Sequence, residues 1–212
     1  GSRLWGLTDR GIFDYDEAWY LLEAKTLHYT SDYLLSTVGL SDVDTSVGLK
    51  AYVKPRGTVP MTSVKPGHTI LTYLGMLVLG TQDFAGLGVS ALSGILTVLL
   101  VFLIGKELGS ARLGLAAGLI LAVSPLHIHY SRSMYSQSNS VFFATLGAYL
   151  WVRLHTRSPG SHTQELLKLC GAGAAIGYAF TCHFNLAWTT IGFIGLEILM
   201  GFVNRLDTRS RV

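Results

Sequence analysis

Three carboxylates gather near the start of the chain, at Asp14, Asp16 and Glu17, and Tyr20 follows Asp16 by one helical turn. A carboxylate so placed can act as a general base or as a metal ligand, and the phenol can orient it or bind substrate. The same residues also suit a structural role, because acidic side chains in a first turn cap free N–H groups and complement the helix dipole. Spacing alone leaves both roles open.

Two cations are the candidates for binding an anion. Lys65 stands before Pro66, and proline suits the first position of a helix because no N–H is needed there. A lysine at lipid-headgroup level can bind a phosphate, or it can be an interfacial anchor whose charged end reaches the headgroups. Arg132 is the only cation in a short polar loop, 127–137, which makes an anionic partner plausible.

His127 and His129 lie in that loop, and two histidines two apart could bind a metal ion. Polar rings at a membrane interface are the commoner explanation. The metal is therefore unknown: no cofactor is certain, and a divalent ion stays open. The sequence contains no Gly-rich phosphate loop, no Walker lysine and no zinc-finger spacing, and nothing in it indicates nucleic-acid binding.

The elements that must position these residues are membrane helices. Hydrophobic residues make up 50% of the chain and charged residues only 14%, against roughly 25% in soluble domains. Residues 84–105 contain no ionisable side chain, and about 20 apolar residues cross a bilayer. The sequence predicts an all-α, multi-pass integral membrane protein, a polytopic bundle in residues 84–203 with about five transmembrane helices, near 84–105, 111–127, 138–153, 166–182 and 185–203.

The basic residues set the expected orientation. The loops 106–112 and 153–168 and the tail 204–212 hold eight of the 16 lysines and arginines, and short basic loops face the cytoplasm. Residues 1–83 and the loop 127–137 are then extracytoplasmic, and the protein belongs in the cytoplasmic membrane with its candidate site on the outer face. The eight residues are Lys106, Arg112, Arg153, Arg157, Lys168, Arg205, Arg209 and Arg211.

Within the extracytoplasmic segment 1–83, two helices are expected beside the membrane. An amphipathic helix over about 14–29 would place Ala18, Leu21, Leu22 and Leu27 on its apolar side. A second over about 67–80 is too short to cross and is expected to lie in the outer interface. The stretch 31–63, rich in Ser, Thr, Asp and Gly, is expected to be loop. In the membrane part, the small-residue pairs Gly114/Gly118 and Gly173/Gly177 suit close helix packing.

Four segments, in this order and spacing, resemble the GT-C glycosyltransferases, including the protein O-mannosyltransferases, the bacterial aminoarabinose transferase and the rhizobial lipopolysaccharide-core glycosyltransferases. Phe13-Asp-Tyr-Asp-Glu-Ala-Trp-Tyr resembles their Asp-Glu motif, and Val64-Lys-Pro-Gly-His resembles their Lys-Pro-Pro segment. Ser124-Pro-Leu-His-Ile-His-Tyr-Ser-Arg-Ser resembles the end of their third helix with the second outer loop. Gly171 to Asn185 resembles the Gly-rich helix that follows.

The resemblance implies an enzyme that transfers a sugar from a polyprenyl-phosphate donor to a lipid, glycan or protein hydroxyl outside the cytoplasm. Asp16 would be the catalytic carboxylate, Glu17 and Tyr20 would support it, and Lys65 with Arg132 would bind the donor phosphate. The alternative is a non-enzymatic polytopic membrane protein, a transporter or a scaffold of a lipid-linked sugar pathway. A transporter would place charges at mid-bilayer, whereas here the charged candidates cluster at one face.

Three positions depart from the family pattern. Gln137 stands where an acidic residue is usual, His183 where a lysine is often found, and Gly67 in place of the second proline. The first departure puts a metal site in doubt. The first family helix and the C-terminal half have no counterpart in the sequence, so an N-terminal fragment is expected, and such a fragment alone can be inactive.

Overall fold

Every element that the computed structural model describes is a helix. The structure describes residues 15–56, 59, 65–156 and 161–186, together with 188, 191–192, 194–196, 198–199 and 201. Asp14, most of the expected span 185–203 and the tail 204–212 lie outside these residues. In order, the elements are α2 (Tyr15–Thr37), α3 (Leu49–Val53), the 3-10 helix η1 (Lys54–Arg56), α4 (Pro66–Leu79), α5 (Asp83–Leu108), α6 (Ala111–Val123), α7 (Pro125–Ser131), α8 (Ser136–Thr156), α9 (His162–Cys182) and the 3-10 helix η2 (Phe184–Leu186).

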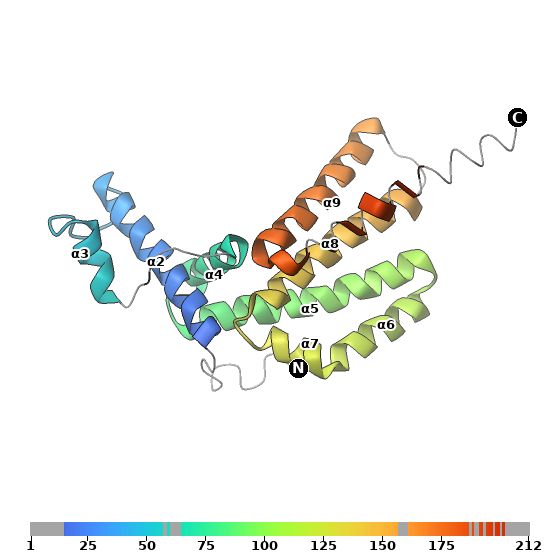
Figure 1. Ribbon diagram of the computed structural model, residues 1–212, viewed down its shortest axis with the longest axis horizontal. Helices are drawn as coiled ribbons and strands as arrows, with labels where there is room; N and C mark the ends of the chain where they lie inside the picture. Colours follow the sequence, from blue (N-terminus) through green and yellow to red (C-terminus); the bar gives the residue numbers. More distant parts are fainter. Residues whose placement is uncertain are drawn as a thin grey trace, which may run out of the picture.

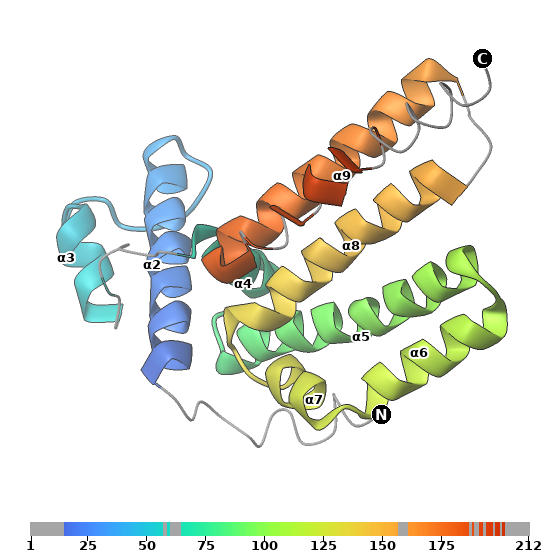
Figure 2. The same ribbon diagram turned by 45° about the vertical axis from the view of Figure 1, so that its right-hand side comes forward.

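Helices α5, α6, α8 and α9 form an elongated bundle (Figure 1). Helix α5 packs against α6 and α8, and α8 packs against α9. Figure 2 shows the result as two helical hairpins side by side, α5 with α6 and α8 with α9. At the far end of the bundle the Arg153 Nε of α8 lies 4.0 Å from the Glu107 carboxylate of α5.

Close approach of α5 and α6 requires two glycines. A Cβ added at Gly105 would lie 2.6 Å from the Cα of Gly114, and one at Gly114 would lie 2.3 Å from the carbonyl oxygen of Phe102. The expectation for Gly114 is thus met by its backbone contact. At Gly173 and Gly177 a Cβ would meet nothing within 4 Å among the described residues, and close packing at these two glycines stays a prediction.

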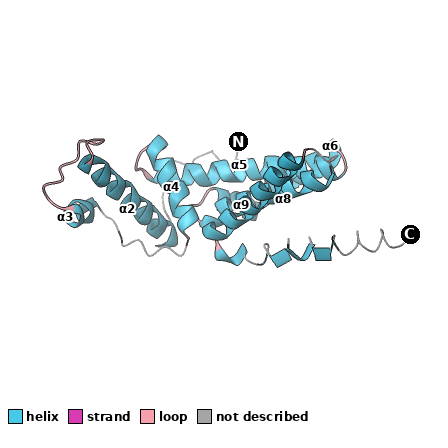
Figure 3. Ribbon diagram, turned by 90° about the horizontal axis from the view of Figure 1, so that it is seen from above, coloured by secondary structure: helices cyan, strands magenta, loops and turns pink. Residues whose placement is uncertain are grey.

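A second group of helices lies at one end of the bundle. Figure 3 shows α2 and α3 beyond that end, with α4 between them and the long helices. Helix α4 packs against α2, α5 and α9, and in Figure 2 α2 runs across the direction of α5. The core at this junction combines α2, α4, α5 and the loop before α8: Tyr20, Leu21, Ala24, Met76, Ala85, Leu87, Ala91 and Met134.

Helix α2 differs from its expected form. It continues past residue 29 to Thr37, and the stretch expected to be loop also contains α3 and η1. Its buried face includes Leu21 with Tyr20 and Ala24, whereas Ala18, Leu22 and Leu27 are only half-buried. The face that packs is therefore rotated from the predicted one and includes two buried carboxylates, Glu17 and Glu23.

One described helix, α5, is long and apolar enough to cross a bilayer, with 26 residues and a mean hydropathy of 2.5 over an 18-residue window. Helices α6 and α7 meet the same criterion only as a pair, and they are bent by 67°. The bend follows from Pro125, which begins α7 after Ser124 ends α6. The first helix of the expected span 111–127 therefore ends at Val123. The bundle has one such helix, or two with the bent pair, and the five-span arrangement stays a prediction.

Candidate active site

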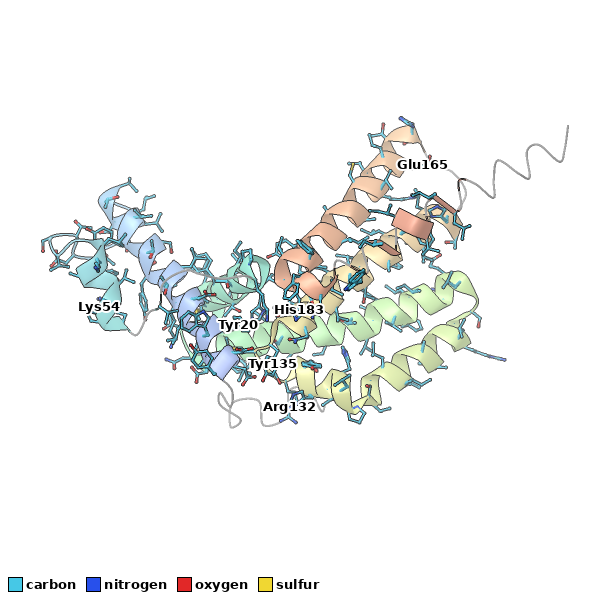
Figure 4. The ribbon with its side chains drawn as sticks, in the orientation of Figure 1. Tyr20, Lys54, Arg132, Tyr135, Glu165 and His183 are labelled. Atoms are coloured by element: carbon cyan, nitrogen blue, oxygen red, sulfur yellow. The ribbon has the colours of Figure 1, made fainter. Side chains whose placement is uncertain are left out.

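The candidate site lies where the first turns of α2 meet the start of α4. Lys65 is the N-cap residue of α4 and Pro66 its first helical residue, as the missing proline N–H predicts. Asp16 and Glu17 lie in the first turn of α2. Figure 4 shows Tyr20 and His183 near the meeting point of α2, α4 and the end of α9, with Tyr135 and Arg132 on the side of α7.

Lys65 and Tyr20 form the central contact of the site. The Lys65 ammonium donates a hydrogen bond to the Tyr20 hydroxyl, and its nitrogen lies 4.7 Å from the centroid of the Tyr20 ring. Burial lowers the pKa of Lys65, and the Asp16 carboxylate opposes that shift. Burial, then Asp16 and then Glu23 raise the pKa of Tyr20 to about 12. Asp16 thus acts electrostatically on both partners of the pair.

Asp16 and Glu17 have different surroundings although they are neighbours in sequence. Asp16 is exposed, whereas Glu17 is fully buried and accepts a hydrogen bond from the backbone N–H of Met134 at 2.8 Å. Successive helical side chains point about 100° apart, so the two carboxylates can have different surroundings. The geometry places Asp16 toward the exterior of the site and Glu17 against the loop that leads into α8.

The structure brings Arg132 to the same end of the molecule. Arg132 is the C-cap residue of α7 and is half-buried, in the loop that Glu17 contacts at Met134. It lies on the α7 side of the junction, apart from Tyr20 (Figure 4). A single phosphate bound by Lys65 and Arg132 together therefore remains a prediction.

His183 closes the site from the end of α9. It is the C-cap residue of that helix, and its Nδ1 accepts a hydrogen bond from the Asn185 N–H at 3.3 Å. Burial lowers the pKa of His183, and the Lys65 ammonium lowers it further. Lys65 therefore affects the charge state of His183, the residue that the resemblance aligns with the family's lysine.

Gly67 allows this end of α9 to approach α4. Its carbonyl accepts a hydrogen bond from the Tyr178 hydroxyl at 3.0 Å. A Cβ at position 67 would lie 2.3 Å from Thr181 Oγ1, 3.0 Å from Cys182 Sγ and 3.1 Å from the Cys182 nitrogen. The departure from the second proline of the family segment therefore has a steric reason in this chain.

Sequence reasoning missed a buried polar chain beneath the site. His68 is fully buried, and its Nδ1 lies 2.8 Å from the Asn139 amide nitrogen. The Asn139 oxygen accepts a hydrogen bond from the Ser93 hydroxyl at 2.7 Å. Burial lowers the pKa of His68 to about 4; the Met134 backbone opposes this and Lys65 adds to it. The only signal in the sequence was a histidine among apolar residues, which does not identify its partners.

The two histidines considered for metal binding have other contacts. His127 Nε2 lies 3.2 Å from the Gly94 carbonyl oxygen of α5, and the ring of His129 packs against Tyr130 and Tyr135. In the part of the chain that the structure describes, no three His, Cys, Asp or Glu side chains are grouped as metal ligands.

The described part of the chain is a helical bundle in which a lysine and a tyrosine meet at one end, near an exposed carboxylate. The family described as dolichyl-phosphate-mannose-protein mannosyltransferase matches residues 61–209, so the chain belongs to this family of membrane glycosyltransferases of the GT-C kind. The matched range contains Lys65, Arg132 and His183, and begins after Asp16, Glu17 and Tyr20. Neither the curated proteins nor the solved structures gave a match.

Proposed function

We propose that the chain forms the extracytoplasmic active face of a membrane glycosyltransferase that moves a sugar from a polyprenyl-phosphate donor to an acceptor hydroxyl. The observation that carries the proposal is the contact of Lys65 with Tyr20, 45 residues apart in sequence, beside the exposed Asp16. A cation for a leaving phosphate and a base for an attacking hydroxyl meet at one end of the bundle, which supports surface chemistry over translocation through it.

The reaction assigned to these groups is a direct displacement. The acceptor O–H gives its proton to the Asp16 carboxylate as its oxygen attacks the anomeric carbon of the sugar. The bond from that carbon to the phosphate oxygen breaks, and the phosphate leaves with the electron pair. Its added negative charge is stabilised by the Lys65 ammonium and, on the α7 side, by the Arg132 guanidinium. The configuration at the anomeric carbon inverts.

Tyr20 and His183 support the phosphate end of the site. The Tyr20 hydroxyl accepts from Lys65 and limits where the ammonium can point. The phenol is neutral in the physiological range, and the raised pKa keeps it neutral well above that range, so it adds no negative charge beside the phosphate. A neutral His183 can donate one ring N–H toward the same anion, because Asn185 occupies the other nitrogen.

The membrane arrangement belongs to the proposal. We place five spans in the cytoplasmic membrane, with α2, α3 and α4 on the outer face and the basic loops inside, as the distribution of lysine and arginine supports. Helix α4, which is apolar but has only 14 residues, then lies at the outer interface and presents Lys65 at headgroup level.

The test is sugar transfer from a polyprenyl-phosphate donor by the full-length protein in lipid nanodiscs carrying Asp16→Asn. Asparagine keeps the shape and removes the base, so we expect the rate to fall by about 10²–10⁴ while donor affinity stays within about twofold. Asp14→Asn compares the other carboxylate of the motif, and Asp42→Asn, an exposed carboxylate outside the site, is the matched control. Near-normal turnover in Asp16→Asn, or a larger loss in Asp14→Asn, would reject Asp16 as the base.

A further inference from the structure

A line of buried polar side chains connects the bundle core to the site. It starts at Ser93 on α5, whose hydroxyl donates to the Asn139 oxygen of α8 at 2.7 Å. Asn139 in turn places its amide nitrogen 2.8 Å from Nδ1 of His68 on α4. His68 and Asn139 have no exposed surface and Ser93 is 7% exposed, so each bond is shielded from water and fixed in direction.

This order of bonds assigns the proton on His68. Because the Asn139 oxygen faces the Ser93 hydroxyl, its NH₂ group faces the histidine, and an amide nitrogen only donates. Nδ1 of His68 must therefore accept, which leaves the proton of the neutral ring on Nε2. Nε2 itself is buried and makes no hydrogen bond within the described structure.

The other side of the His68 ring contacts the site. It meets the Tyr20 ring edge-on, with centroids 5.1 Å apart and an interplanar angle of 83°. Tyr20 is itself only 7% exposed, and its hydroxyl accepts the hydrogen bond from Lys65. His68 thus lies between a fixed hydrogen-bond partner in the core and the phenol that contacts the Lys65 ammonium.

We propose that His68 is a positioning residue: Asn139 fixes its ring, the ring fixes the phenol of Tyr20, and the phenol directs the Lys65 ammonium. The chain Ser93, Asn139, His68, Tyr20 and Lys65 crosses four helices, α5, α8, α4 and α2, before it reaches the start of α4. That this ammonium binds a donor phosphate rests on the proposed function. The contacts from Ser93 to Lys65 do not depend on that function.

The expected loss of donor affinity depends on how far the Lys65 ammonium moves when the contacts behind it are lost. A displacement of about 1 Å in a positioned group can cost about 10²-fold in rate. A tilt of Tyr20 moves an ammonium on a flexible side chain, which can partly readjust. We therefore expect donor affinity to fall by about tenfold when one of the contacts between Ser93 and Tyr20 is removed.

The variants separate ring shape from hydrogen bonding. His68→Phe keeps the aromatic contact with Tyr20 and removes the acceptor for Asn139. Asn139→Leu and Ser93→Ala break the chain farther from the site without touching His68 or Tyr20. The matched control is Thr72→Val, since Thr72 is also fully buried on α4 and its hydroxyl makes no hydrogen bond within the described structure.

The first measurement does not depend on the function. In ¹⁵N-histidine spectra of the full-length protein in nanodiscs, the signal lost in His68→Phe should show a protonated Nε2 and an accepting Nδ1. Asn139→Leu should shift that signal, and Thr72→Val should leave it unchanged. A protonated Nδ1 on His68 would overturn the proposed hydrogen bond from Asn139 and the positioning role with it, independently of the proposed function.

The second measurement is the dissociation constant of a polyprenyl-phosphate sugar. His68→Phe, Asn139→Leu and Ser93→Ala should raise it about tenfold, and Thr72→Val less than twofold. If Lys65→Ala weakens binding while the other three leave it at the wild-type value, the positioning role is refuted and the proposed function survives. If Lys65→Ala has no effect on the dissociation constant, the proposed function loses its phosphate site. The histidine spectra alone then test the proposed contacts of His68. Should His68→Phe fail to fold, Asn139→Leu and Ser93→Ala give the same two answers.

Discussion

Glu17 and Met134 are joined by a buried hydrogen bond of 2.8 Å, across 117 residues of sequence, from the Met134 N–H to the Glu17 carboxylate. Met134 in turn packs into the space that Gly86 of α5 leaves, where a Cβ would lie 2.4 Å from the Met134 sulfur. The start of α2, the face of α5 and the loop that contains Arg132 therefore meet at one point. The relative position of Asp16 and Arg132 depends on that meeting.

Removing the Glu17 carboxylate tests this junction. Glu17→Ala leaves the buried Met134 N–H without its acceptor, which costs about 1–3 kcal/mol. Glu17→Gln retains an oxygen that can accept and should lose much less. Thermal unfolding of the full-length protein in nanodiscs measures both. Equal stability of Glu17→Ala and the wild type would show that the bond contributes nothing to the fold.

A side chain at position 67 should separate α4 from the end of α9. Gly67→Ala places a Cβ against Thr181 and Cys182, and such overpacking costs typically about 1–3 kcal/mol. Gly173→Ala is the matched control, because its Cβ meets none of the described residues within 4 Å and alanine favours a helix by roughly 0.5–1 kcal/mol. Unfolding midpoints should therefore shift in opposite directions, and a gain in stability for Gly67→Ala would contradict the contact.

His68 should make the fold sensitive to acid. Its pKa is about 4 in the folded protein, against 6.5 for an ordinary histidine. Between these values the unfolded chain binds more protons than the folded one, so stability falls as pH falls from about 6.5 to about 4, by at most about 3 kcal/mol. Above pH 6.5 this contribution is fully present.

The measurement for His68 is the unfolding midpoint at pH 7.5, 5.5 and 4.5 for the wild type and for His68→Gln. Other titrating groups are common to both proteins and cancel in the comparison. The drop between pH 7.5 and 4.5 should be smaller in the variant. An identical drop in both would mean that His68 titrates normally.

Thiol labelling tests the orientation in the membrane. In a background with Cys170→Ser and Cys182→Ala, Thr45→Cys should react with an impermeant reagent added to intact cells. Ser210→Cys should react only after the membrane is permeabilised, because the basic tail is expected inside. The reverse pattern would move the Lys65 site to the cytoplasmic face and exclude the proposed donor geometry.

Local rules predicted the local features of the site. Pro66 marked the start of α4, because proline suits the first position of a helix wherever it occurs. The adjacency of Asp16 and Glu17 in a helix also implied that their side chains diverge. Which of them is buried could not be predicted, because it depends on Met134, whose position is set by Gly86 and the packing of α5.

The length of α2 was missed for a local reason. Ser31 and Thr37 read as loop residues by composition, but their hydroxyls donate to the carbonyls of His28 and Leu34 one turn earlier. Serine and threonine can satisfy themselves in this way inside a helix. The contact of Tyr20 with Lys65 was missed for the opposite reason, since nothing local links residues 45 apart.

The close packing of α4 against the end of α9 restricts which substitutions this sequence can accept. A side chain at position 67 would occupy space that residues 181 and 182 already fill. The residues tolerated at these three positions therefore depend on one another. A proline or any larger residue at 67 is compatible only with a helix α9 that ends earlier or lies farther away. Among related chains, we therefore expect the residue after Lys-Pro to covary with the two residues before His183. Glycine at the first position should occur together with larger side chains at the other two.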